Sequence, residues 1–404
     1  MASLLGFTSL AFVSLLTYLL AIRYPDISKV LFVGLILRIF LLLIDNYIFS
    51  LPGSDADAES FEGFAKFLSK DGFFYLISNF SGPDPYFISY FIAIPYSLFG
   101  VSVMMAQSIG LLFGIGSIFL AWSLAEKLWN KRIANTVGWV VALFPTLILF
   151  SVIVLREVYI CFFILLALHG LVGWVKTEKF KYVILATISF IGATFFHGAM
   201  IVGLIVFISI VAFSSLRRCI KLLKNYRINL SFINFLILFT VASVTFLSNK
   251  ISVPYLGTFE QGSNIEILLQ KTYHATAGEA SWPKWTIANS PIELLYKAPI
   301  RSMYVIFSPF PWDVTKIKHF IGMLDGLLYF YLTILILLNI KTIWNDRCLR
   351  IILIILLAYI FVFGIGVGNF GTGIRHRSKF VVMFILLAAP MLKRVILQKK
   401  NDKI

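Results

Sequence analysis

The sequence predicts an all-α polytopic membrane protein. Of its 404 residues, 59% are hydrophobic and only 13% are charged, whereas a soluble globular domain carries about 25% charged residues. Several apolar runs approach or exceed the roughly 20 residues that a helix needs to cross the hydrocarbon core of a bilayer. We therefore expect a single membrane domain over residues 1–404, with about 11 transmembrane helices and additional juxtamembrane helices.

The expected spans follow the apolar runs, and polar or basic segments separate them. The first run has no basic start and no small-residue cleavage site, so we expect it to remain as a helix. The three cysteines show neither disulfide nor metal spacing. The spans are expected at residues 4–22, 29–49, 102–124, 133–151, 154–174, 181–196, 198–214, 229–247, 319–340, 350–368 and 378–392.

The distribution of charge predicts the orientation of the chain. Residues 393–403 are strongly basic, which favours a cytoplasmic C-terminus because positively charged loops are retained on that side. Counting the spans backwards places the other basic loops on the same face, and these cytoplasmic segments together carry the whole net charge of +16. No nucleic acid partner is needed to account for the basic charge.

Two long segments, residues 50–101 and 248–318, then fall on the external face. Residues 84–100 are apolar, but the stretch is short, contains Pro95 and would spoil the charge asymmetry if it crossed. We therefore expect it to lie along the outer membrane surface. Apolar residues recur at helical spacing over residues 61–68, opposite polar ones, which predicts an amphipathic helix at the interface.

An acidic cluster opens the first external segment: Asp55, Asp57 and Glu59 follow directly on a long apolar run. A carboxylate at the membrane surface can deprotonate an acceptor hydroxyl or coordinate a divalent cation. Asp55 and Asp57 are therefore our catalytic candidates, Glu59 is a further candidate, and a divalent cation is the one cofactor left open. The alternative is structural: Ser54 would cap a helix that begins near Ala56, with acids in its first turn.

A basic cluster lies on the same expected face, where the positive-inside rule disfavours it. It consists of Arg375, His376, Arg377 and Lys379. Arginine forks bind phosphate oxygens in pairs, and the preceding glycines would allow a tight loop with close backbone approach. We expect these four residues to bind the phosphate of a substrate. The alternative is that they only reach lipid headgroups at the start of a span.

Five further ionisable residues lie near the external ends of spans or in the second external segment: Arg156, Glu157, His197, His274 and Arg301. Arg156 and Glu157 interrupt an apolar run, which fits a local ion pair or a helix end as well as it fits a site. His197 lies at a helix boundary, where a structural role fits as well as a catalytic one. His274 and Arg301 lie in the segment expected to cover a site.

The order of these features resembles GT-C-type membrane glycosyltransferases. An early span leads to an external loop that opens with Asp55 and Asp57, then to juxtamembrane helices and to a Pro-Tyr-Ser-Leu-Phe-Gly start of the next span at residues 95–100. Residues 142–157 are also similar to this group. Residues 368–380 are similar to proteins of bacterial O-antigen and exopolysaccharide clusters, which include both GT-C-like transferases and Wzy-type polymerases.

The resemblance implies a bacterial inner-membrane enzyme that assembles O-antigen, capsule or exopolysaccharide at the periplasmic face. The donor would be a sugar or oligosaccharide on undecaprenyl phosphate or pyrophosphate, and the acceptor a glycan. An Asp would act as the base on the acceptor hydroxyl, and the basic cluster would hold the departing phosphate. Single-sugar transfer and Wzy-type polymerisation of repeat units both remain open. Polymerisation would add a chain-length regulator protein to the partners.

The alternative to an enzyme is a transporter or flippase of polysaccharide precursors. It predicts charged residues deep in several spans and symmetry between the two halves of the chain. The expected spans contain Arg38 and Asp325, and no halves match. Arg38 is expected to pair with an acid such as Asp45 or Asp325 in a structural role.

Overall fold

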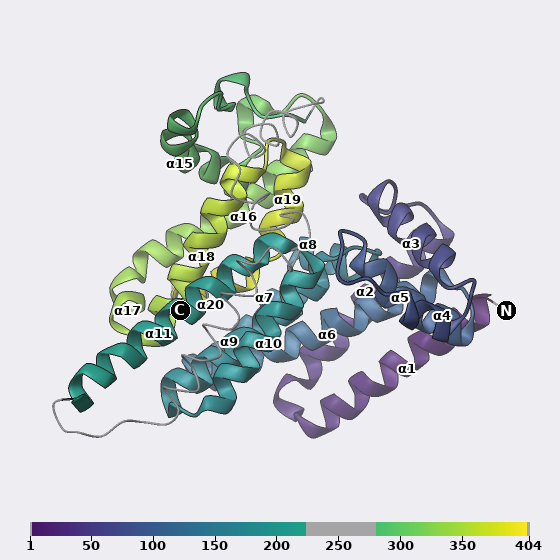
Figure 1. The fold of residues 1–404 in the computed structure, drawn as a ribbon, viewed down its shortest axis with the longest axis horizontal. Helices are drawn as coiled ribbons and strands as arrows, with labels where there is room; N and C mark the ends of the chain where they lie inside the picture. The colour runs from purple at the N-terminus through teal and green to yellow at the C-terminus, as the bar shows by residue number, and fades with distance from the viewer. Residues whose placement is uncertain (1, 224–279, 402–404) are drawn as a thin grey trace. The chain divides into compact units, whose positions relative to one another are not determined.

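The computed structural model describes residues 2–223 and 280–401 (Figure 1). The described chain is almost entirely helical, as the composition predicted. It forms two compact units. The first comprises Met1–Leu166, Leu327–Trp344 and Arg375–Ile404, and the second comprises Ala167–Gly326 and Asn345–Ile374.

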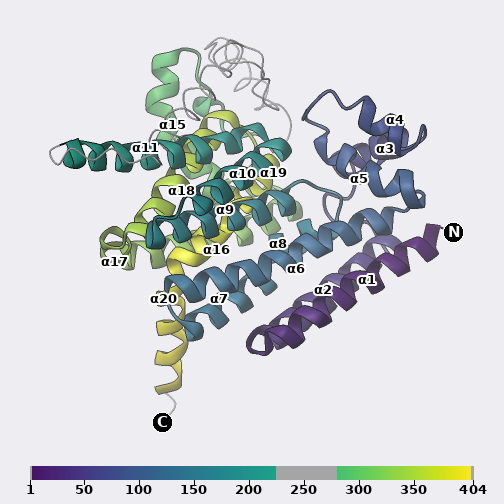
Figure 2. The ribbon, with the colours of Figure 1, turned by 60° about the horizontal axis from the view of Figure 1, so that its bottom comes forward.

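Five helices form the body of the first unit: α1 (Ala2–Arg23), α2 (Ser28–Tyr47), α6 (Val103–Leu128), α7 (Lys131–Leu143) and α8 (Pro145–Val152). A short connection folds α2 back along α1, and both pack against α6 (Figure 2). Small residues allow α8 to approach α6 closely: a Cβ added at Gly114 would lie 2.6 Å from Cβ of Ser151. Such close packing through glycine is typical of helices in membranes, where apolar side chains gain little by leaving lipid.

The break between α7 and α8 explains the buried arginine of the second span. Pro145 has no N–H and disfavours a helical residue before it, and the two helices meet at a bend of 55°. The carbonyl of Ala142 accepts a hydrogen bond from Nη1 of Arg38 at 2.9 Å, while Nε donates to Oγ of Ser151 at 2.9 Å. The expected pairing of Arg38 with an acid is therefore wrong. This cation thus satisfies the Ala142 carbonyl at the helix break and also contacts the Ser151 hydroxyl further along α8.

The segment between α2 and α6 folds into α3 (Asp57–Leu68), α4 (Phe73–Ser78) and α5 (Phe87–Phe99), which lie together beyond the end of α2 (Figure 2). The predicted helix at residues 61–68 is confirmed as part of α3. Its buried residues Phe61 and Ala65 face α5, whose Ser89 donates to the carbonyl of Phe61 at 2.8 Å. Part of the apolar face of α3 thus packs on protein, although Phe67 remains exposed.

Seven helices among the described residues are long and apolar enough to cross a membrane, or eight if the bent pair α7–α8 counts as one span. The chain is therefore a polytopic helical membrane protein, but the number of spans expected from the sequence was larger. Two expected spans correspond to shorter apolar helices, Phe180–Phe196 and Val381–Leu392. The expected span at residues 229–247 lies outside the described residues.

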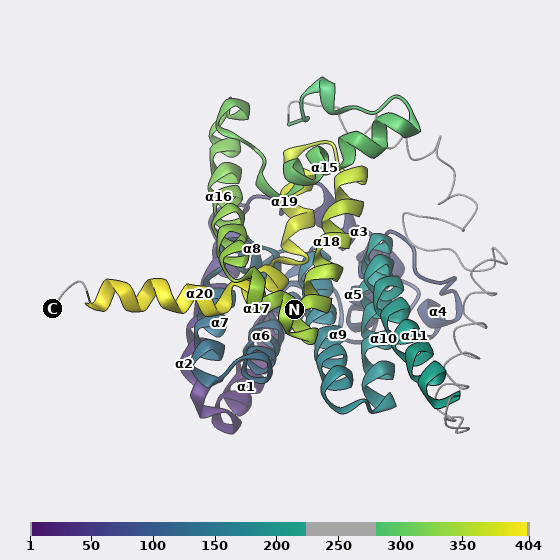
Figure 3. The same cartoon turned by 90° about the vertical axis from the view of Figure 1, so that its left-hand side faces the viewer.

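The second unit contains α10 (Phe180–Phe196), α11 (Ile201–Leu223), α15 (Pro291–Phe307) and α18 (Arg347–Gly366). Helix α11 packs against both α10 and α18, and α15 packs on α18 (Figure 3). Four helices contribute residues to both units: α9 (Glu157–Thr177), α16 (Ile317–Leu338), α19 (Phe370–Ser378) and α17 (Ile340–Asn345), of which only Asn345 belongs to the second unit. Helix α20 (Val381–Asn401) lies wholly in the first unit.

Candidate functional site

Glu157 occupies the first residue of α9. A carboxylate is favoured there because the unpaired N–H groups at a helix start carry partial positive charge. The preceding residues run beside α6, where a Cβ at Gly110 would lie 3.1 Å from the carbonyl oxygen of Ser151. This close approach brings the start of α9 into the packed interior. Only 2% of the Glu157 surface is exposed.

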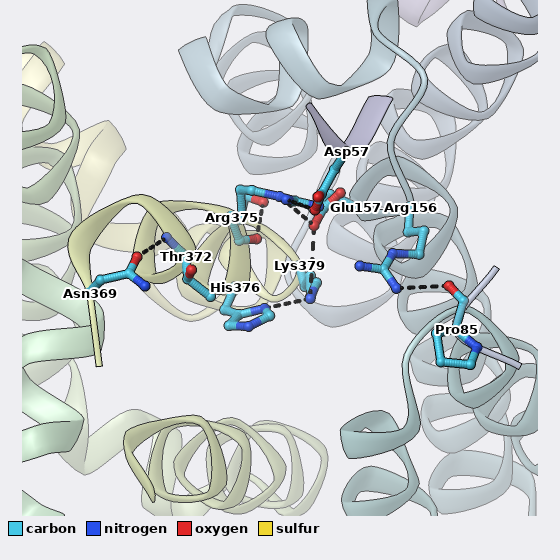
Figure 4. Close-up of polar contacts among 10 residues, drawn as sticks. Asp57, Pro85, Arg156, Glu157, Asn369, Thr372, Arg375, His376 and Lys379 are labelled. Carbon is cyan, nitrogen blue, oxygen red and sulfur yellow. Dashed lines mark hydrogen bonds and ion pairs between the residues drawn. The ribbon is translucent and has the colours of Figure 1, made fainter. Parts of the chain in front are cut away.

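The basic cluster does not form the predicted loop. Residues Phe370–Ser378 form helix α19, and Oδ1 of Asn369 accepts a hydrogen bond from the backbone N–H of Thr372 at 2.8 Å (Figure 4). An asparagine in this position satisfies one of the unpaired donors at a helix start, which offsets the weak helix propensity of the glycines that follow. Because these residues lie on a helix, the basic side chains point in different directions and have different neighbours.

Arg375 stands between two carboxylates, all three in the first unit (Figure 4). Its Nη1 donates to Oδ2 of Asp57 at 2.5 Å, and its Nε donates to Oε1 of Glu157 at 3.3 Å. The Asp57 side chain is 54% exposed, while that of Glu157 is 1% exposed. Burial alone would lower the pKa of Arg375, but the two carboxylates outweigh it and raise this pKa above its ordinary value. Arg375 therefore remains a cation and links a buried acid to an accessible one.

Lys379 and His376 lie next to this triad. Nζ of Lys379 is 3.9 Å from Oε1 of Glu157 and 2.5 Å from Nδ1 of His376, and the lysine side chain is fully buried. An ammonium group can only donate, so with Lys379 protonated Nδ1 of His376 is the acceptor and the imidazole proton lies on Nε2. Three of the four predicted phosphate-binding residues are thus gathered around Glu157.

Arg377, the fourth, lies elsewhere. Its surface is fully buried, and its guanidinium lies 5.0 Å above the ring of Tyr329 on α16. Because residues two positions apart in a helix do not share a face, Arg375 and Arg377 cannot both present their forks to one ligand from α19. Arg377 therefore lies apart from the other three predicted phosphate-binding residues.

Arg156 connects the start of α9 to the segment that carries Asp57. Its Nη1 donates to the carbonyl of Pro85 at 3.1 Å (Figure 4), and its guanidinium lies 4.7 Å from the centre of the Phe61 ring. Contacts of a buried guanidinium with an aromatic face are favourable because the ring face is electron-rich. Arg156 thus holds α3 and α5 near Glu157, a positioning role that the sequence did not reveal.

Asp55 and Glu59 are exposed and lie on either side of Asp57 in the chain. The structural alternative for this region is wrong in one respect, because Ser54 does not cap α3. The residue before the helix is Ala56, which provides no side-chain cap, and Oγ of Ser54 instead donates to Oδ1 of Asp45. Asp57 is the acid of this segment that contacts Arg375.

Arg301 belongs to the second unit and has a structural role. It is fully buried, and burial lowers its pKa to about 10. Its nitrogens donate to the carbonyls of Gly364, Ile365 and Val367 at the end of α18, and to that of Thr286. Carbonyls at a helix end lack partners within the helix, so Arg301 satisfies the last turn of α18 rather than covering a site.

His197 is also in the second unit, where it follows α10 and its ring lies 5.4 Å from that of Phe363. It is nearly buried. This environment fits the structural alternative for a histidine at a helix boundary. His274 lies outside the described residues.

Within the described part of the chain, one polar atom of the cluster has no hydrogen-bond partner. Oε2 of Glu157 is buried and accepts no hydrogen bond from the described residues. A buried oxygen without a donor costs free energy, so this atom marks a place where a ligand or water donor would be stabilised. Among residues 2–223 and 280–401, no group of three or more His, Cys, Asp or Glu could hold a metal ion.

No protein-family model, curated protein or solved structure matches this chain. The resemblance to GT-C-type transferases and Wzy-type polymerases therefore stays a prediction. The geometry of the cluster is the evidence that bears on function; the cluster comprises Asp57, Glu157, Arg375, His376 and Lys379.

Proposed function

We propose that this protein is a membrane glycosyltransferase that takes its sugar from a polyprenyl phosphate or pyrophosphate donor. The observation that carries the proposal is Arg375, a cation shared by the accessible Asp57 and the buried Glu157. Sugar transfer from a lipid phosphate needs a base for the acceptor hydroxyl and a cation for the departing phosphate. The cluster contains both, next to helices of membrane-spanning length.

The donor phosphate would bind the Arg375 fork in place of Asp57. Arginine binds phosphate as it binds carboxylate, and the Asp57 side chain is the more exposed of the two partners. Displaced from Arg375, Asp57 can accept the proton of the acceptor hydroxyl. The acceptor oxygen then forms a bond to the anomeric carbon, the bond from that carbon to the phosphate oxygen breaks, and its electron pair stays on the phosphate.

Glu157 would remain bound to Nε of Arg375 during this exchange, because it is buried and also faces the amine of Lys379. It therefore fixes the fork while Asp57 moves. Its open Oε2 can accept a hydrogen bond from a hydroxyl of the sugar. Glu157 would thus position the cation and orient the donor.

This chemistry serves either version of the reaction at the periplasmic face of a bacterial inner membrane. A single sugar or a whole repeat unit can leave the same phosphate, so O-antigen, capsule and exopolysaccharide assembly are all compatible. Undecaprenyl-linked donors are the natural substrates of such a site, with a growing glycan as acceptor.

The test uses the purified protein in proteoliposomes that contain labelled undecaprenyl-linked sugar and an acceptor glycan. Asp57→Asn should lower transfer by about 10²- to 10⁴-fold, the usual contribution of a general base. Asp71→Asn is the matched control, because Asp71 is an exposed acid of the same segment. Equal activity of the two variants would refute the role of Asp57.

The same preparation distinguishes transfer from translocation. If the labelled lipid crosses the bilayer without losing its sugar, the flippase alternative holds and the transferase proposal fails. Long chains as the product would favour polymerisation, and a single added sugar would favour simple transfer.

A further inference from the structure

Asp45 organises a hydrogen-bond network outside the cluster described above. It lies in the last turn of α2, where its Oδ1 accepts from the backbone N–H of Leu51 at 2.7 Å and from Oγ of Ser54 at 2.5 Å. Its Oδ2 accepts from Nε2 of Gln107 on α6 at 2.7 Å. Oε1 of Gln107 in turn accepts from Nδ2 of Asn46 at 2.6 Å.

A carboxylate is an unfavourable residue at this place. The last turn of a helix carries partial negative charge, which repels an acid. Asp45 is nevertheless stabilised there because each of its oxygens has donors, one oxygen on the connecting loop and the other on α6. The side chain therefore ties the loop that follows α2 to a helix of the packed interior, since Gln107 is only 2% exposed.

The loop held in this way leads directly to Asp57. Gly53 has a φ of 92° and Ala56 a φ of 53°. The first suits glycine, but the second is an unfavourable conformation for alanine and persists only where the surroundings impose it. Two anchored residues, Leu51 and Ser54, immediately precede this conformation. Their hydrogen bonds to Asp45 are the observed constraint.

We infer that Asp45 is a positioning residue that, together with Gln107, sets the location of Asp57 at the start of α3. The inference rests on the proposed function for its catalytic consequence, but the geometric part does not need it. Asp45 itself does not touch the substrate. It acts through residues 51–56, and only Asp55 and Ala56 lie between the anchored Ser54 and the catalytic carboxylate of Asp57.

A reciprocal exchange tests the network. In Asp45→Asn, one carboxylate oxygen becomes an NH₂ group, which can only donate. This group faces either Nε2 of Gln107 or the donors of Leu51 and Ser54, so the hydrogen bond on that side is lost because both groups are donors. In Gln107→Glu, two carboxylates face each other. In the double variant Asp45→Asn/Gln107→Glu, the amide faces the carboxylate, whose other oxygen still accepts from Asn46. Both donors and acceptors are then matched again.

Each single variant should lower kcat by about ten- to a hundredfold, because a displacement of about 1 Å at a catalytic group has effects of this size. KM for the lipid-linked donor should change by less than about threefold, since Arg375 is untouched. The double variant should return to within about threefold of the parent protein, because coupled partners are not additive. A double variant as impaired as the product of its two single variants would overturn the inference.

Ser54→Ala is the milder variant if Asp45→Asn does not fold. It removes one of the two loop contacts and leaves Asp45 with Leu51 and Gln107. We expect a three- to tenfold fall in kcat, the equivalent of about one hydrogen bond. An unchanged kcat in a normally folded Ser54→Ala protein would contradict the inference.

An experiment that does not measure transfer activity separates this inference from the proposed function. Asp55→Cys places a thiol on the exposed part of the loop, and its rate of modification by a membrane-impermeant maleimide reports the loop conformation. The rate should rise in the Asp45→Asn and Gln107→Glu backgrounds and return in the double variant. If transfer is absent from the parent protein but this pattern holds, only the proposed function fails. Equal rates in all four backgrounds would refute the positioning role.

Discussion

Replacing Glu157 by Gln tests whether the buried acid holds the cluster together. The Glu157 and Lys379 side chains are 1% and 0% exposed, and that of Arg375 is 25% exposed. Removing one partner of a buried ion pair costs about 3–5 kcal/mol because the remaining charge is left in a poorly solvated place. The new amide oxygen can still accept from Nε of Arg375, which recovers about 1 kcal/mol. We therefore expect Glu157→Gln to lower the free energy of unfolding by about 2–4 kcal/mol.

The assay is thermal unfolding of the protein in nanodiscs, followed by circular dichroism at a fixed scan rate. Glu293→Gln is the matched control: Glu293 pairs with Lys297 at 2.9 Å, but its side chain is 30% exposed. Solvent screens such a pair, so its loss should change the melting temperature much less than Glu157→Gln does.

A second substitution tests whether the loss of stability in Glu157→Gln comes from an unpaired charge. In Glu157→Gln/Lys379→Met the unpaired ammonium is gone, and a buried pair replaced by groups of similar volume is often neutral. The double variant should therefore melt at a higher temperature than Glu157→Gln alone. Two results would contradict a buried ion pair at Glu157: equal melting temperatures for Glu157→Gln and Glu293→Gln, or a lower melting temperature for the double variant than for Glu157→Gln alone.

Three further predictions concern other contacts. Asp57→Asn should change the free energy of unfolding by less than about 1 kcal/mol, because the Asp57 side chain is 54% exposed and Arg375 keeps its contact with Glu157; a large loss in the same melting assay would give Asp57 a structural role. Arg301→Met should reduce the yield of folded protein strongly, since four backbone carbonyls lose their donor; size-exclusion chromatography measures this, and a normal yield would contradict it. The hydrogen bond from Lys297 holds the pKa of Glu293 below its ordinary value of 4.5. The start of α15 should therefore gain stability above that pH and lose it as the pH falls through the lower folded-state pKa. Hydrogen exchange measures this change, and it should disappear in Lys297→Met.

The helices themselves were largely predictable. Hydropathy located α1, α2 and α6 because a long apolar run has no stable alternative to a helix in a bilayer. The amphipathic pattern located α3 because its period matches the helical turn. By contrast, α19 was expected as a loop, since Gly371 and Gly373 lower helix propensity and the sequence gives no measure of the tertiary contacts that override it.

The sequence predicted which types of residue form the candidate site, but not which individual residues contact one another there. The acids at the start of the first external segment and the basic residues near the end of the chain stood out because charge is expensive beside apolar spans. The sequence could not separate Arg375 from Arg377, because their different surroundings appear only when α19 is folded and packed. Nor could it find the partners of Arg38, which are a serine and two carbonyls rather than an acid.

The amino-acid sequence was enough to predict a polytopic helical membrane protein, because burial of apolar surface and internal hydrogen bonding favour helices within each apolar run. The contact of Asp57 with Arg375, 318 positions away, and that of Arg375 with Glu157 are visible only in the folded protein. The strength of a charge contact depends on distance and burial, and both are set by how the helices pack rather than by their order in the chain.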